Sequence, residues 1–181
     1  MDVAPERDLT VNWRSISLLI KNKVEPDSEY YEPVSATHNM LRVMEAMRAA
    51  GAEAAIGDLY TDLGQRIHHR QQLMDIDLAA AVAATGADRS LAEAANDASF
   101  DDAVRAETEA GLALVGEDVG TPIVAIETEP GSWQGYFGPV ISPAPTGEAA
   151  LRLWDNLVGL MEFPELFELK RTRNVGPIFA E

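Results

Sequence analysis

Three histidines and the absence of cysteine limit the chemistry available to this chain of 181 residues. Without cysteine, these residues offer no disulfide, no thiolate ligand for a metal and no nucleophilic thiol. His68 and His69 are adjacent, so a helix cannot direct both at one ion, and no carboxylate stands at metal spacing beside them. His38 lies near a predicted helix start without a visible base-and-nucleophile partner. We therefore predict no metal site and assign no catalytic residue.

Motifs of other enzyme classes are also missing from the sequence. It contains no phosphate-loop lysine motif, no GxGxxG and no GxSxG. The 30 acidic and 14 basic side chains give a formal net charge of −16, which repels nucleic acid and anionic lipid. No apolar run approaches the length of a membrane span, and the first ten residues do not resemble an export signal. We therefore expect no nucleic-acid or membrane partner and a cytoplasmic location.

The elements that position any site begin with a predicted strand. Residues 9–20 combine β-branched, aromatic and aliphatic side chains, which favours a largely buried strand. The polar stretch 21–33 contains two prolines and predicts a loop. Met40, Met44 and Met47 then recur at spacings of three and four, which is typical of a helix with one buried face.

Four further helices are predicted before the pattern changes. Two cover residues 55–63 and 75–85, and each ends at or just before a glycine. Ser90 and Ser99 each precede a carboxylate by three residues, a capping-box pattern that predicts a helix start at each serine. The helix after Ser99 should end near Val115. This succession predicts an all-helical region.

The last third of the chain predicts a β-hairpin and one more helix. Residues 123–126 form a short apolar run, Pro130 begins a turn, and residues 136–137 indicate a second short strand. Thr146 is predicted to cap a final amphipathic helix that stops before Pro164. The order of strand, helices, hairpin and helix predicts the α+β class.

Several separated segments carry a family resemblance. Residues 116–122 (GEDVGTP), followed by a short apolar strand and then 136–139 (YFGP), are similar to the cis-proline loop and hairpin of DsbA-like proteins. Residues 11–19, 58–68 (DLYTDLGQRIH) and 167–173 (FELKRTR) match a strand, an insert helix and the tail of one branch, in the right order. Over nearly its whole length the chain thus resembles the mycothiol-dependent nitroreductase branch of the DsbA-like thioredoxin-fold oxidoreductases.

The resemblance implies a thioredoxin-like fold interrupted by a helical insert. Residues 1–32 and 116–181 would form an incomplete thioredoxin-like core, and residues 33–115 the insert. In the family a Cys-Pro-x-Cys motif follows a first strand, whereas residues 1–7 look like the tail of the helix that carries this motif. We therefore expect a core truncated at its N-terminus, with Met1 an internal methionine and upstream in-frame DNA encoding the missing part. A natural fragment or a diverged relative is the alternative.

A binding site for a thiol is also implied by the resemblance. A cis peptide before Pro122 would turn the backbone of Thr121, next to Gly120, toward the thiol. Asn22 and Tyr30 match positions that the family places near the thiol or nitro substrate, with ordinary loop polarity as the alternative interpretation. His38 is assigned to the same cleft. The predicted substrate-binding residues are therefore Gly120, Thr121, Pro122, Asn22, Tyr30 and His38.

The function implied is that of a thiol-disulfide oxidoreductase whose catalytic cysteine these residues lack. Its expected cofactor is a low-molecular-weight thiol such as mycothiol, without a metal, and its expected partner is a nitro compound or a disulfide protein. Two alternatives stay open: a kappa-class, glutathione-dependent isomerase-like protein, and a non-catalytic fragment. A core without a strand and a helix would expose apolar surface, so we predict a homodimer or aggregation.

Overall fold

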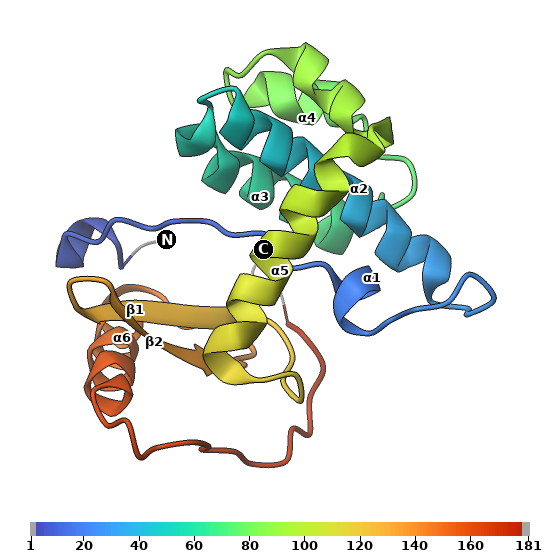
Figure 1. Cartoon of the computed structure of the whole chain (residues 1–181). Helices are drawn as coiled ribbons and strands as arrows, with labels where there is room; N and C mark the ends of the chain where they lie inside the picture. The colour runs from blue at the N-terminus through green and yellow to red at the C-terminus, as the bar shows by residue number, and fades with distance from the viewer. Residues whose placement is uncertain (1–2, 179–181) are drawn as a thin grey trace. The chain divides into compact units, whose positions relative to one another are not determined.

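A computed structural model describes residues 3–178 and divides the chain into two compact units, each considered by itself. One unit, Trp13–Gly111, is helical; the other comprises Met1–Asn12 and Leu112–Glu181 and contains a two-stranded sheet (Figure 1). The α+β class predicted from the sequence is confirmed. Among residues 3–178, no helix has both the length and the apolar character that crossing a membrane requires.

Helix α2 (Tyr31–Ala49) is the longest element of the helical unit. Its side chains Met40, Met44 and Met47 are all at most 7% exposed and belong to the unit's apolar core, which confirms the predicted buried face. The helix begins inside the stretch predicted as a loop. Pro33 is tolerated there because the first turn of a helix does not need its N–H groups for internal hydrogen bonds.

The other helical elements of this unit include short 3-10 and π turns, labelled η. Three predicted helices are confirmed, with ends within a few residues of the prediction. The elements are α1 (Leu18–Lys21), η2 (Glu53–Ala55), α3 (Ile56–Gly64), the π turn η3 (Gln65–His69), α4 (Leu78–Ala84), η4 (Arg89–Asn96), η5 (Ala98–Phe100) and α5 (Asp101–Val115), whose residues 112–115 fall in the other unit. The buried side chains of α3, α4 and η4 pack with those of α2 into one core.

The predicted strand over residues 9–20 is wrong. Residues 9–17 form no strand, and Val11 is 44% exposed. Strand-forming residue types need a neighbouring strand, and among residues 3–178 the sheet contains only the two strands of the hairpin. The apolar run that follows is the helical turn α1. Ser17 starts it, because its side chain accepts a hydrogen bond from the N–H of Ile20.

The predicted capping serines are also wrong. The N-caps of η4 and η5 are Asp88 and Asp97, two residues before each serine, and their carboxylates accept the N–H groups of Ser90 and Ser99 at 2.9 Å. The first of these helices is a 3-10 helix rather than an α-helix. An aspartate two residues before a serine competes with the serine as a cap, because a carboxylate is the stronger acceptor.

The hairpin and the last helix of the other unit agree with the prediction. Strands β1 (Ile123–Glu129) and β2 (Ser132–Phe137) pair antiparallel, and Gly131 in the turn has φ +81°. Helix α6 (Gly147–Met161) follows; Thr146 occupies its N-cap position, but its side chain makes no capping bond. The turn η1 (Pro5–Arg7) also belongs to this unit.

Two expectations from the sequence concern the boundaries of the chain's parts. The thioredoxin-like core and its division from an insert at residues 32/33 and 115/116 stay predictions. Segment 13–32 clusters with the helical unit. The assignment of Met1 as an internal methionine falls outside residues 3–178.

Candidate functional site

The segment from Gly120 to Pro122 leads directly into the hairpin. The peptide bond between Thr121 and Pro122 is cis, as are two later X-Pro bonds. The carbonyl of Pro122 accepts a hydrogen bond from the N–H of Gly138 at 2.8 Å. A Cβ on Gly120 would lie 3.1 Å from the Phe137 ring, so glycine permits this close approach. The end of β2 therefore holds the segment in place.

The backbone of Thr121 is the part of this segment that suits ligand binding. Strand pairing begins at Ile123, which faces Phe137, so Thr121 lies beyond the strand-to-strand ladder. Thr121 and Pro122 are both exposed. Since Pro122 has no N–H, the donor and acceptor that this segment can offer to an extended ligand are those of Thr121.

Asn22 and Tyr30 lie in the helical unit, at the ends of two helices. Asn22 is the C-cap of α1; it is exposed, and its side-chain oxygen accepts a hydrogen bond from Lys21 Nζ at 3.3 Å. Tyr30 is the N-cap of α2, and 64% of its surface is exposed. Both side chains can therefore reach a ligand from solvent.

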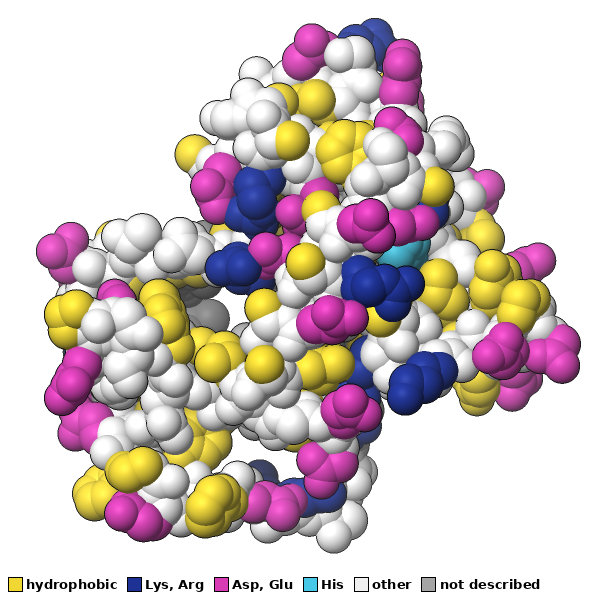
Figure 2. Space-filling view, viewed as in Figure 1, with side chains coloured by type: hydrophobic (Ala, Val, Ile, Leu, Met, Phe, Trp, Pro, Cys, Tyr) yellow, Lys and Arg dark blue, Asp and Glu magenta, His cyan; other side chains and the backbone are white. Residues whose placement is uncertain are grey.

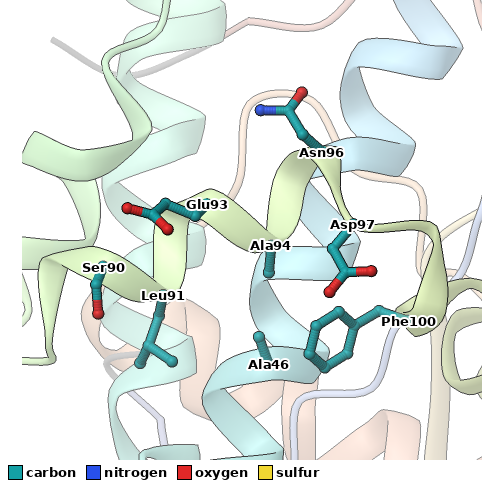
Figure 3. Close-up of a pocket in the computed structure, with 8 residues that line it drawn as sticks. All are labelled: Ala46, Ser90, Leu91, Glu93, Ala94, Asn96, Asp97 and Phe100. Carbon is teal, nitrogen blue, oxygen red and sulfur yellow. The ribbon is translucent and has the colours of Figure 1, made fainter.

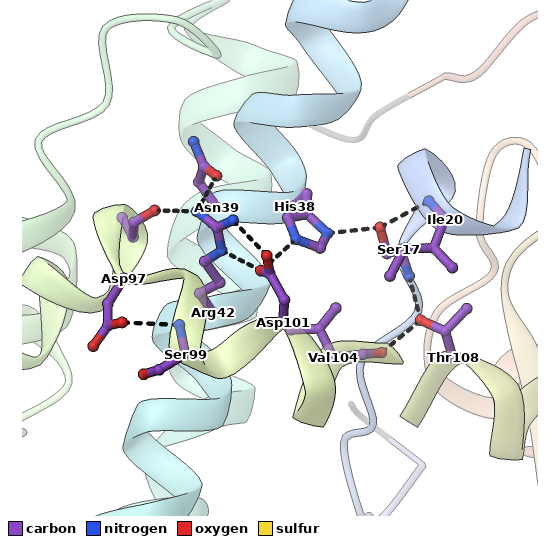
Figure 4. A network of polar contacts seen from close by, with 11 residues as sticks. Ser17, Ile20, His38, Asn39, Arg42, Asp97, Ser99, Asp101, Val104 and Thr108 are labelled. Carbon is purple, nitrogen blue, oxygen red and sulfur yellow. Dashed lines mark hydrogen bonds and ion pairs between the residues drawn. The ribbon is translucent and has the colours of Figure 1, made fainter. Parts of the chain in front are cut away.

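His38, in contrast, is only 5% exposed and lies in a buried polar network (Figure 4). Its Nδ1 lies 2.9 Å from Ser17 Oγ, and its Nε2 lies 3.0 Å from Asp101 Oδ1. The Asp101 carboxylate accepts the proton on Nε2, and the Ser17 hydroxyl is bonded to Nδ1. The partners of His38 come from residues far away in the sequence, which is why they could not be recognised there.

Asp101 is fixed by a second partner, Arg42. The guanidinium donates from Nε to Oδ1 at 2.5 Å and from Nη2 to Oδ2 at 3.0 Å. This hydrogen bond with Arg42 is the main reason why the pKa of the Asp101 carboxyl lies below its usual range; burial opposes the shift, and the bond with His38 adds to it. The carboxylate is thus ionised at neutral pH and holds the imidazole in one orientation.

The order hydroxyl, imidazole, carboxylate is also that of a catalytic triad, but this network is closed to substrate. Ser17 is 1% exposed, and its oxygen is already engaged by the N–H of Ile20. Its own N–H donates to Thr108 Oγ1 at 3.0 Å. The network therefore ties α1, α2 and α5 together. The sequence offered one signal for it, since His38 and Arg42 are four residues apart on one face of α2.

The predicted site residues fall into two groups. Gly120, Thr121 and Pro122 are consecutive in the unit that contains the hairpin, whereas Asn22, Tyr30 and His38 belong to the helical unit. Within the helical unit, His38 connects through Ser17 to the helix that ends at Asn22. That the two groups meet around one ligand stays a prediction.

A separate pocket of about 390 Å³ lies in the helical unit (Figure 3). Ala46 of α2 and side chains around η4 and η5, including Glu93, Asp97 and Phe100, line it. Its polar side chains are exposed, and Asp97 is engaged as a cap. Within residues 3–178, no three His, Cys, Asp or Glu side chains form a group that could hold a metal ion.

The face drawn in Figure 2 shows how the charged side chains are distributed. In Figure 2, Asp and Glu side chains are spread over the visible face, with Lys and Arg side chains between them. Such a surface does not attract a phosphate backbone.

Comparison with known proteins points to one family. The family model described as "Rv2466c-like: Mycothiol-dependent nitroreductase Rv2466c" matches residues 1–171. The chain is also 29% identical over 188 aligned positions to "Uncharacterized protein Rv2286c" of Mycobacterium tuberculosis (strain ATCC 25618 / H37Rv). That alignment covers 98% of this chain and 75% of the relative. All six predicted site residues lie inside the range that the family model matches.

Proposed function

Because the chain belongs to the Rv2466c-like family of mycothiol-dependent nitroreductases, we propose that it binds mycothiol and brings it together with a nitro compound. The observation that carries this proposal is the family match over residues 1–171 in a chain without cysteine. The sulfur that reacts must therefore come from outside these 181 residues. The protein's own side chains bind and orient the thiol.

The residues present suit a small, polar thiol. The exposed backbone of Thr121 offers one N–H donor and one C=O acceptor, which match the amide groups of a cysteine derivative. The exposed amide of Asn22 can both donate and accept, as the hydroxyl-rich sugar part of mycothiol requires. Tyr30 adds an exposed aromatic ring and a hydroxyl. We propose a role in thiol binding for each of these residues and a thioredoxin-like fold for the chain.

The chemistry balances without a cysteine in this chain. The bound thiol supplies the sulfur nucleophile. When two thiols form one disulfide, they release two electrons and two protons, and these convert a nitro group into a nitroso group and water. The chain contributes no proton donor of its own to this scheme. Its part is to hold the reactants close together, which raises their effective concentration.

Calorimetric titration and a turnover assay test the proposal. We expect the full chain to bind mycothiol with a dissociation constant of about 1 mM or tighter, and to consume an aromatic nitro compound faster only when mycothiol is present. Insulin disulfides should be reduced no faster than in buffer, because the chain has no thiol. Absence of binding to mycothiol at concentrations well above that value would overturn the proposal.

The lack of cysteine also favours a second candidate, a kappa-class isomerase-like function in which the cofactor thiol does the chemistry. There the sulfur adds to an electrophilic substrate and leaves again without net oxidation. The two candidates differ in their products: nitro reduction yields mycothiol disulfide, whereas isomerisation leaves the thiol unchanged. Mass spectrometry of the thiol after turnover separates them.

A further inference from the structure

We propose that His38 is a positioning residue: it acts through Ser17 and helix α1 to orient Asn22 toward the bound thiol. The part that concerns the thiol rests on the proposed function. The claim that His38 fixes the position of Asn22 rests on contacts within the helical unit. Because His38 is 5% exposed with both ring nitrogens engaged inside this unit, its effect on a ligand passes through another residue.

The imidazole is itself held rigidly. Asp101 accepts from Nε2 at 3.0 Å and is fixed by two hydrogen bonds from Arg42. Arg42 is anchored in turn by Asn39 Oδ1 at 3.0 Å and by the carbonyl of Ala95 at 3.1 Å. Figure 4 shows these groups in one line that leads to Ser17. The ring therefore presents Nδ1 in a single direction.

Ser17 is the point at which this network meets α1. It lies 2.9 Å from His38 Nδ1, its N–H donates to Thr108 Oγ1, and its oxygen accepts the N–H of Ile20. The Thr108 hydroxyl donates its proton to the carbonyl of Val104, one turn earlier in α5, so its oxygen is free to accept the Ser17 N–H. Ser17 is thus fixed to both α2 and α5 before α1 begins, and at 1% exposure water cannot replace these partners.

Helix α1 depends on this anchor because it contains only four residues, Leu18–Lys21. A helix of one turn is not stable by itself, so its position follows from what holds its ends. From Ser17 the chain reaches Asn22 in five residues, and the Asn22 N–H closes the turn on the carbonyl of Leu18 at 3.0 Å. The orientation of Asn22 is therefore coupled to the bond between Ser17 and His38.

The test compares four single variants of the full chain and the double variant His38→Leu/Ser17→Ala. His38→Leu removes both ring nitrogens, and His38→Asn keeps a polar atom near the position of Nδ1, facing Ser17. Ser17→Ala removes the other partner of the bond. Val43→Ala is the matched control, because Val43 is a fully buried core residue on the same helix, α2.

The first readout is amide hydrogen exchange at Lys21 and Asn22 in the free protein. We expect His38→Leu and Ser17→Ala to raise the exchange rate about tenfold over Val43→Ala, the factor set by one buried hydrogen bond. His38→Asn should stay within about threefold of the wild type. Rates in His38→Leu equal to those in Val43→Ala would overturn the proposal. Should His38→Leu not fold, the smaller substitution His38→Ala is compared with Val43→Ala by the same criterion, because Ser17→Ala also removes the N-cap bond to Ile20.

The second readout is the dissociation constant for mycothiol. His38→Leu and Ser17→Ala should each weaken binding, and the double variant should bind no more weakly than Ser17→Ala alone, because both substitutions break one connection. If the losses in mycothiol affinity from the two single substitutions add up in the double variant, His38 does not act through Ser17. If the wild type binds no mycothiol, the proposed function fails, and hydrogen exchange still decides whether His38 positions Asn22.

Discussion

The indole of Trp13 stacks on the ring of Tyr60, with centroids 4.6 Å apart and planes at 28°. The stack lies over Gly57, where an added Cβ would be 2.7 Å from Trp13 Nε1. Arg48 Nη2 also donates to the Trp13 carbonyl at 2.6 Å, so the indole cannot easily move away. The start of the helical unit is thus attached to α3 through a contact that only glycine permits.

Gly57→Ala should therefore destabilise the helical unit by about 2 kcal/mol, the typical effect of overpacking a well-filled site. Urea unfolding followed by tryptophan fluorescence measures this loss. Gly64→Ala in the same helix is the control: its Cβ would meet no atom within 4 Å, so stability should stay equal or rise. Equal losses in both variants would contradict the close approach of Trp13.

Asp97→Ala tests which residue caps the segment before α5. We expect it to lower the midpoint of thermal unfolding by about 3 °C, because the N–H of Ser99 loses its acceptor. Ser99→Ala should have a smaller effect, because it keeps that backbone bond. Differential scanning calorimetry compares the two. A larger fall in the unfolding midpoint for Ser99→Ala than for Asp97→Ala would show that Ser99 is the cap, as the sequence pattern predicts.

The elements that could be predicted from sequence are those fixed by local chemistry. The spacing of Met40, Met44 and Met47 marks a helix face because neighbours three and four residues apart decide it. The hairpin was predictable because Pro130 and Gly131 separate two short apolar runs. Gly51, Gly86 and Gly116, all with positive φ, likewise mark the ends of α2, α4 and α5.

The features that could not be predicted depend on partners distant in the chain. Residues 9–17 have the composition of a strand, yet whether they form one depends on a neighbouring strand. The bond between Ser17 and Thr108 joins residues 91 positions apart. No periodicity connects His38 with Asp101 either. The sequence therefore shows each residue of the polar network but not that these residues contact one another.

Asp101→Asn should make the stability of the protein less dependent on pH. Since the folded-state pKa of Asp101 lies below its ordinary value of 3.8, its contribution is complete above that pH and is lost as the pH falls through the lowered value. At pH 7 the variant should be less stable by about 1 kcal/mol, a modest figure because the carboxylate is 35% exposed. The difference should vanish in strong acid.

Urea unfolding at a series of pH values measures this difference. Asp102→Asn is the matched control, since it removes the next carboxylate from the same helical turn without breaking the bonds to Arg42 and His38. A gap between wild type and Asp101→Asn that widens as the pH falls would contradict the sign of the shift.

Asn22→Ala and Thr121→Ala separate the two ways in which we propose that the thiol is held. Asn22 would contribute its side chain, so its loss should weaken mycothiol binding about tenfold. Thr121 would contribute only backbone groups, so alanine should leave the dissociation constant within about twofold. Asn156→Ala, an exposed asparagine on α6, controls for general effects. Calorimetric titration measures all three, and a greater loss from Thr121→Ala than from Asn22→Ala would show that the threonine hydroxyl binds the thiol.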